Sequence, residues 1–149
     1  MKIILLDAGP LGILANPGNS PLAFQCRAWA DGLLAQGDHL LISEVADYGV
    51  RRELLHAGKI QSVARLDSLK TAWPYLPINT STMLKAAEFW ARARQLGKPT
   101  ASNLRLDADA ILVAQADLLI ADGEDVVIAT DNVRHLSLFV PAENWRSIL

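Results

Sequence analysis

The chain has 149 residues, of which 51% are hydrophobic, and this predicts one compact domain over residues 1–149 with a single core. Its net charge of −2 excludes a global positive field, so any contact with a nucleic acid must use a local patch. No apolar run approaches the roughly 20 residues that a membrane-spanning helix needs. Asp7 interrupts the N-terminal apolar run before a signal-peptide core is complete, and the single Cys26 cannot form an intrachain disulfide. These features favour a cytoplasmic protein.

The first half of the chain alternates apolar strands with helices. Residues 2–6 predict a fully buried strand, because their apolar side chains are consecutive and do not alternate with polar ones. Asp7 is expected to begin a short helix that ends near Ala15, and a loop rich in turn-forming residues separates it from a helix over 22–36. The next elements expected are a strand over 39–43, a helix from 43 or 44 to 58, and a helix over 60–72.

The second half continues the alternation. Prolines at or beside both ends of the strand expected over 75–78 predict that it is short or lies at a sheet edge. Thr80 or Ser81 is expected to cap a long helix that stops at Gly97 and carries Trp90 in the core. The remaining elements expected are a loop over 100–103, a helix from about 107 to 123, a strand over 126–130, a short helix and a strand near 138–140. This pattern predicts an α/β sandwich with a mostly parallel sheet.

Aspartates follow two of the predicted strands and begin the last long helix. These residues are Asp7, Asp131 and the pair Asp107 and Asp109. Strand ends at one edge of a parallel sheet converge in space, so the side chains are expected to share one pocket. Any one of them can be explained as a helix cap. Serine, threonine or asparagine would cap equally well, so aspartate at three junctions favours a cation site.

The type of ligand indicates the type of cation. Crowded carboxylates repel one another unless a cation or a proton compensates their charge. The predicted ligands are oxygens, with no histidine or cysteine among them, which favours Mg²⁺ or Mn²⁺ over zinc. An ion held mainly by carboxylates and water is typical of enzymes that hydrolyse phosphate esters.

At these positions the sequence resembles the PIN domain, particularly the bacterial ribonuclease toxins called VapC. The resemblance rests on the strand ending in Asp7, on acids in the helix after the second strand, and on two motifs, Asp109-Ala-Ile-Leu-Val-Ala-Gln-Ala116 and Thr130-Asp131-Asn132. It implies a three-layer α/β/α sandwich with a mostly parallel central sheet. It also implies a Mg²⁺- or Mn²⁺-dependent endoribonuclease, usually dimeric, whose toxin members are neutralised by a small antitoxin.

The resemblance assigns roles to individual residues. Asp7 corresponds to the first metal-binding aspartate of the family and Asp109 to the one that opens the late helix, so both are expected to be catalytic and to hold the metal. Asp107 either shares the ligation or caps the helix. Asp131 is a further candidate metal ligand, and Asn132 is expected to orient the ion or a phosphate oxygen of the substrate.

The sequence departs from the family pattern in the helix after the second strand. The family has a glutamate there that faces the metal, and one register places Gly49 at that position. Glu44 and Asp47 lie three residues apart on one helix face, so either is expected to reach the ion instead, and Asp47 is also a catalytic candidate. Glycine inside a helix costs about 1 kcal/mol relative to alanine, so a reason other than helix propensity is expected at this position.

Four arginines lie close to the acidic motifs in the sequence, namely Arg51, Arg52, Arg105 and Arg134. They are expected to neutralise substrate phosphates beside the acids. The alternative for each of them is a solvated surface charge or an ion pair.

Together these features predict a metal-dependent endoribonuclease of the VapC toxin type, with RNA as substrate and, by resemblance, a small antitoxin partner and a homodimeric assembly. The departure at Gly49 leaves open a non-catalytic PIN domain that binds a protein or RNA without cutting it. A phosphatase of the haloacid-dehalogenase kind also begins with a strand ending in aspartate, but it needs a second acid where this chain has Gly9. Nucleotide-binding folds of the dehydrogenase or P-loop type are disfavoured, because neither of their glycine signatures follows the first strand.

Overall fold

A parallel five-stranded sheet forms the centre of the molecule. The computed structural model describes residues 1–97 and 103–149. The strand order is β3-β2-β1-β4-β5, and all four neighbouring pairs are parallel. The strands are β1 (Ile3–Leu6), β2 (His39–Ser43), β3 (Tyr75–Leu76), β4 (Val126–Ala129) and β5 (Ala142–Glu143). The predicted α/β class with a mostly parallel sheet is therefore confirmed.

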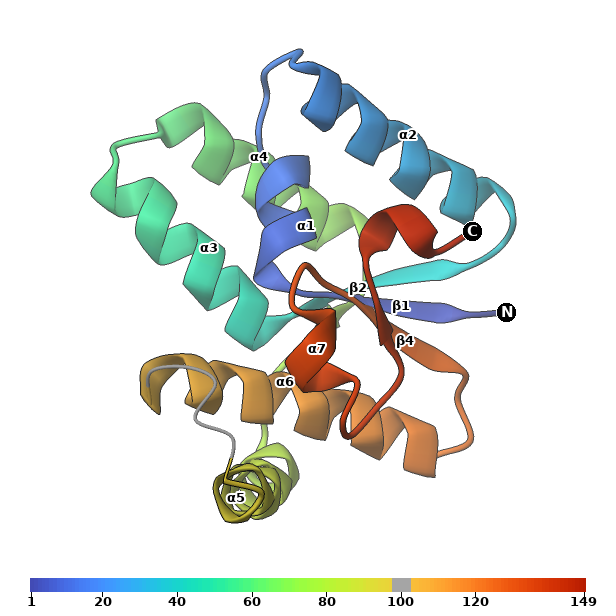
Figure 1. Cartoon of the computed structure of the whole chain (residues 1–149). Coiled ribbons are helices and arrows are strands. Elements are labelled where there is room, and N and C mark those ends of the chain that lie inside the picture. The colour runs from blue at the N-terminus through green and yellow to red at the C-terminus, as the bar shows by residue number, and fades with distance from the viewer. Residues whose placement is uncertain (98–102) are drawn as a thin grey trace.

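Helices cover both faces of this sheet, which gives three layers (Figure 1). One face carries α1 (Ala8–Leu14), α2 (Pro21–Ala35), α3 (Glu44–His56) and α4 (Ile60–Ala72). The other carries α5 (Thr80–Gln95), α6 (Asn103–Ala121) and α7 (Val133–Leu136). Within the described part of the chain, every helix is too short or too polar to cross a membrane.

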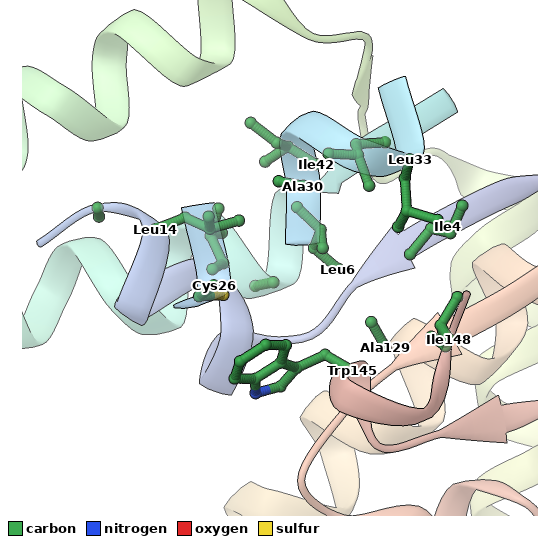
Figure 2. Close-up of a cluster of buried hydrophobic side chains, with 14 of the residues drawn as sticks. Ile4, Leu6, Leu14, Cys26, Ala30, Leu33, Ile42, Ala129, Trp145 and Ile148 are labelled. Atoms are coloured by element: carbon green, nitrogen blue, oxygen red, sulfur yellow. The ribbon is translucent and has the colours of Figure 1, made fainter. Parts of the chain in front are cut away.

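Strands β1 and β4 are buried on both faces, as their consecutive apolar residues predicted. Side chains alternate between the two sides of a strand, so Ile4 and Leu6 of β1 contribute to the core under α1 to α4. Leu5 contributes to the second core, under α5 and α6. Figure 2 shows the first core, in which Cys26 of α2 and Trp145 of the C-terminal 3-10 helix η1 (Trp145–Ser147) lie among the aliphatic side chains. The C-terminal segment thus packs into the same core as α1 and α2.

Two predictions about the third quarter of the chain were wrong. The residue that caps α5 is Asn79, whose Oδ1 accepts hydrogen bonds from the Thr82 amide at 2.9 Å and the Thr82 hydroxyl at 3.0 Å. The sequence had favoured Thr80 or Ser81, which lie inside the first turn. Trp90 was expected in the core but is 36% exposed, with the Arg94 guanidinium 5.1 Å from its ring centroid. Apolar spacing alone does not show which face of a helix meets the sheet.

Two further differences concern element boundaries near the C-terminus. Helix α6 begins at Asn103 rather than near residue 107, so part of the loop predicted over 100–103 is helical and the rest lies outside the described residues. The last strand is Ala142–Glu143 and not 138–140, and it pairs in parallel with β4. Short elements next to prolines leave little periodicity in the sequence, so their positions are set by pairing with distant strands.

The cap of α5 offers a direct test of these assignments. Asn79→Ala should lower the free energy of unfolding by about 1 kcal/mol, because the amides of the first helical turn lose their acceptor. Thr80→Ala should change it by less than about 0.5 kcal/mol, since Thr80 is exposed and does not cap. Urea unfolding followed by circular dichroism measures both values. A larger loss for Thr80→Ala than for Asn79→Ala would contradict the observed boundary.

Candidate active site

The order of the strands determines where a ligand can enter. Strands β2 and β3 follow β1 on one side of the sheet, whereas β4 and β5 lie on its other side. Parallel α/β sheets open a crevice at the carboxyl ends of the strands where the order reverses in this way. A cleft of about 490 Å³ lies at this place, and its polar lining consists of Asp7, Arg52, Arg105, Asp109, Asp131 and Asn132.

Asp7 is fixed by two hydrogen bonds at the end of β1. Its Oδ1 accepts from the Ala8 amide at 2.7 Å, and its Oδ2 accepts from the Thr130 hydroxyl at 2.7 Å. The Thr130 side chain is fully buried at the end of β4, and its oxygen also accepts from the Asn132 amide at 2.8 Å. Asp7 therefore does begin α1, but its second oxygen is oriented by a contact across the sheet that helix capping does not require.

Asp109 reaches the cleft from α6, which lies on the other face of the sheet from α1 and α3. It lies in the second turn of α6, because the helix begins at Asn103, and it is therefore not a cap. The Asn132 side chain donates a hydrogen bond from Nδ2 to Asp109 Oδ2 at 3.2 Å. Asn132 thus connects the segment after β4 to α6. The sequence placed Asp109 in the first turn, and the earlier start of the helix corrects that position.

Burial disfavours the charged form of both acids. Burial, followed by the charge of Asp7, raises the pKa of Asp109 to about 6, and Arg105 opposes this effect. Burial also raises the pKa of Asp7, whereas the hydrogen bonds from Thr130 and Ala8 lower it. Ionising both carboxyls therefore costs free energy, which a bound cation would recover.

Asp131 completes the acidic lining at the end of β4. Its carboxylate lies against Gly9 so closely that a Cβ atom at Gly9 would clash with it. Asp131 is not a helix cap, because Asn132 occupies that position before α7. Of the acids considered as caps in the sequence, only Asp7 has a capping hydrogen bond in the described residues.

Glu44 and Asp47 lie outside this lining. Asp47 is only 4% exposed, and its two oxygens accept from Arg51 Nε at 3.1 Å and from the Tyr75 hydroxyl at 2.8 Å. Glu44 Oε1 accepts from the Ile78 amide at 2.9 Å. The rotation of α3 explains this, since successive residues turn by about 100° and both acids face the β3 side rather than the cleft. The structure does not bring either of them to Asp7 and Asp109.

Gly49 occupies the face of α3 that does line the cleft. A Cβ atom at this position would lie 4.0 Å from the Ala8 Cβ, which is an ordinary contact, so a longer side chain could extend from here. The register that places Gly49 at the glutamate position agrees with this orientation. Among residues 1–97 and 103–149, no three His, Cys, Asp or Glu side chains form a group that could hold a metal ion.

The four arginines separate into different environments. Arg52 and Arg105 line the cleft, and the charge of Arg105 acts on both Asp7 and Asp109. Arg51 instead pairs with Asp47 and, at 2.8 Å, with Asp67 of α4. Arg134 is exposed on α7, away from the described lining of the cleft.

Asp107 is also exposed, on α6, and it lines a neighbouring groove rather than the cleft. Sequence reasoning gave no positioning role to Thr130 or Gly9, although both support the acids. The signal for Thr130 was its place at the end of a buried strand directly before Asp131. Gly9 carried no distinctive signal, because its role appears only when β1 and β4 are paired.

The raised pKa of Asp109 predicts an unusual dependence of stability on pH. Its value in the folded protein, about 6, lies above its ordinary 3.8, so the folded state binds the proton more tightly and stability falls as the pH rises through this range. In EDTA at about pH 8, the free energy of unfolding of Asp109→Asn should be about 1 to 2 kcal/mol higher than that of the original protein, after allowance for solvent screening.

Below about pH 4 the two proteins should be equally stable, because Asp109 is then protonated in both states. Asp107→Asn, on the exposed face of the same helix, serves as the control and should change stability by less than about 0.5 kcal/mol. Urea titrations across this pH range measure the difference. A stabilisation that does not vary with pH would contradict the assignment.

Comparison with known proteins identifies the fold. No family model matches the sequence, and no curated protein matches it significantly. Several solved structures match almost the whole chain. VapBC2 from Rickettsia felis, bound to a promoter DNA fragment, has 18% identity and a TM-score of 0.65 over 96% of this chain and 98% of the matched one.

Two further matches are of the same kind. VapBC-1 from nontypeable Haemophilus influenzae has 18% identity and a TM-score of 0.66 over 97% and 99% of the two chains. DNA-bound VapBC from Salmonella typhimurium has 15% identity and a TM-score of 0.67 over 97% and 99%. Identity at this level establishes the fold and not the activity. The chain therefore has the PIN-like fold found in VapBC assemblies, as its motifs predicted.

Proposed function

We propose that this protein is a Mg²⁺- or Mn²⁺-dependent endoribonuclease of the VapC type. One observation carries the proposal: carboxylates from the ends of β1 and β4 and from α6 line the same cleft as two arginines. Acids that hold a divalent ion and cations that attract phosphates are both needed to cut a phosphodiester. The PIN-like fold supports the same conclusion.

The donor set suits a hard divalent ion. Asp7 and Asp109 would hold it, with Asp131 as the third carboxylate on the lining. Mg²⁺ usually keeps several waters and uses one or two carboxylates together with substrate phosphates, so a site with few protein ligands fits this ion. Such an ion supplies Lewis-acid activation of water and of the phosphoryl oxygens.

The neighbouring residues have supporting roles. Thr130 and Asn132 hold the carboxylates of Asp7 and Asp109 by the hydrogen bonds described above. Arg52 and Arg105 provide positive charge for the phosphates on either side of the cleaved bond. Substrate RNA would therefore be gripped by the arginines while the acids retain the ion.

A second candidate function is a non-catalytic module that binds RNA or a protein. It is favoured by Gly49, which in one register occupies the position where the family has a metal-facing glutamate. A protein with a weakened ion site can keep the shape of the cleft and still bind RNA or a protein without hydrolysing RNA.

A small antitoxin protein and a homodimer are further parts of the proposal. The structural neighbours are VapBC assemblies, which supports an antitoxin partner. Met83, Leu84 and Trp90 of α5 expose apolar surface that is compatible with a protein contact.

Cleavage of RNA tests the enzyme directly. Purified protein should cut single-stranded RNA in Mn²⁺ and leave it intact in EDTA. Asp7→Asn and Asp109→Asn should reduce the rate at least about 100-fold, because each removes a negative ligand while keeping the size of the side chain. The distant Asp122→Asn should cut at the original rate, since this position is exposed and outside the cleft.

Gel electrophoresis of labelled RNA measures the rates, and circular dichroism verifies that each variant is folded. Intact RNA across several sequences and both metals would overturn the enzyme and favour the binding module. A loss of activity in Asp107→Asn equal to that in Asp109→Asn would restore Asp107 to the ligand set.

Gly49→Glu tests the missing ligand. The new carboxylate should raise the affinity for Mn²⁺ at least about tenfold, which corresponds to roughly 1.4 kcal/mol. Gly49→Ala is the matched control, because it fills the same helical position without an oxygen. It should leave metal affinity unchanged and stabilise the helix by about 0.5 to 1 kcal/mol. Titration calorimetry measures the affinities, and equal Mn²⁺ binding by both variants would contradict the register.

A further inference from the structure

A second hollow adjoins the cleft beside Gly49. It has a volume of about 380 Å³ and lies between the first turns of α3 and the start of α6. The two hollows share Val45, Gly49, Arg52 and Ala108 in their walls, so they adjoin each other. Figure 1 shows these parts of α3 and α6 facing each other. We call the second hollow the side groove and define it by Tyr48, Arg52, Ile78 and Ile111.

The absence of a side chain at Gly49 connects the side groove to the cleft. Gly49 is part of both walls, and a long side chain there would stand between the two hollows. Glycine in the middle of α3 weakens the helix, so its presence is more readily explained by the space that it leaves.

Tyr48 gives the side groove an aromatic surface. The side chain is 62% exposed, although tyrosine usually buries much of its ring. The Arg52 guanidinium lies one helical turn further on, 5.2 Å from the centroid of the Tyr48 ring. An exposed ring beside an arginine, with Ile78 and Ile111 as the apolar wall, is the combination that binds one unpaired nucleotide.

We propose that the side groove binds the nucleotide next to the cleaved phosphodiester of single-stranded RNA, with its base stacked on Tyr48 and its phosphate beside Arg52. This proposal rests on the proposed ribonuclease function, because the acid cleft is where the phosphodiester would lie. The position of the side groove beside that cleft favours RNA over a protein segment as the occupant. Stacking reads no particular base, so Tyr48 would add affinity for unpaired RNA rather than a strict sequence preference.

The two acids of the side groove are compatible with a base. Glu44 Oε1 already accepts a hydrogen bond from the Ile78 amide. Asp107 is exposed on the rim, where its carboxylate can accept from the exocyclic amino group of a base. Arg52 is therefore the group in this groove that meets the phosphate, and the acids lie beside the base.

Binding of a fluorescein-labelled single-stranded RNA tests the side groove. Anisotropy is measured in Ca²⁺, which takes oxygen ligands as Mg²⁺ does, and gels of the same samples verify that the RNA is intact. Tyr48→Ala should weaken binding by roughly 5- to 150-fold, since stacking contributes about 1 to 3 kcal/mol per base. Tyr48→Phe keeps the ring and should bind within about twofold of the original protein.

Leu55→Ala is the matched control, because Leu55 lies on the same helix with the same exposed fraction of 62%. It should not change RNA affinity. The loss caused by Tyr48→Ala should persist between about 50 and 200 mM salt, whereas the loss caused by Arg52→Gln should shrink, since only the phosphate contact releases counterions.

A series of RNAs, each with one abasic position, locates the base. The original protein should lose affinity at one position beside the cleaved bond, and Tyr48→Ala should show no further loss there. The same affinity for RNA in Tyr48→Ala and the original protein would overturn the side groove as a base site and leave it to a protein segment, without affecting the nuclease proposal.

A loss of RNA binding in Tyr48→Ala without any cleavage by the original protein would separate the base site from the nuclease proposal. If Tyr48→Ala loses RNA binding but the original protein never cuts RNA in Mn²⁺, the enzyme is overturned and Tyr48 stacks a base in a module that binds RNA without cutting it. Failure of the original protein to bind any single-stranded RNA would overturn both proposals.

Discussion

The hydrogen bond from the Thr130 hydroxyl to Asp7 joins chain segments 123 residues apart, and the geometry of the candidate site depends on it. The parallel pairing of β1 with β4 brings the two strand ends together, and the buried hydroxyl then orients the Asp7 carboxylate. The same oxygen accepts from the Asn132 amide, and the Asn132 side chain donates to Asp109. One buried threonine therefore helps to position acids from both layers on rigid elements, which is what precise chemistry requires.

The cleft contains positive as well as negative side chains, so its charge is closer to neutral than that of a purely acidic site. Three carboxylates share the lining with Arg52 and Arg105, and the charge of Arg105 acts on both Asp7 and Asp109. A glutamate in place of Gly49 would strengthen the attraction for a cation and weaken the attraction for RNA. In the proposed function, glycine at this position leaves the cleft more favourable to phosphate than glutamate would.

The sequence predicted most of this architecture, because consecutive apolar residues identify buried parallel strands and the acids at their ends must then converge. It could not predict the rotation of α3, since Asp47 and Gly49 differ by two residues and so by about 200° around the helix axis. Asp47 therefore meets Tyr75 and Arg51, whereas Gly49 meets the cleft. The exposure of Trp90 was likewise beyond the pattern, because spacing gives the apolar stripe of a helix and not what covers it.

The ionisation of Asp109 bears on the choice between an enzyme and a binding module. Burial and the neighbouring Asp7 raise the pKa of Asp109 to about 6, so at neutral pH the charged form is maintained at a cost in stability. Asparagine at this position would keep an acceptor for Asn132 and remove that cost. A chain that bound no cation would gain from the change. In the proposed function, a divalent ion held by Asp7 and Asp109 would offset that cost, and the space at Gly49 would serve substrate binding.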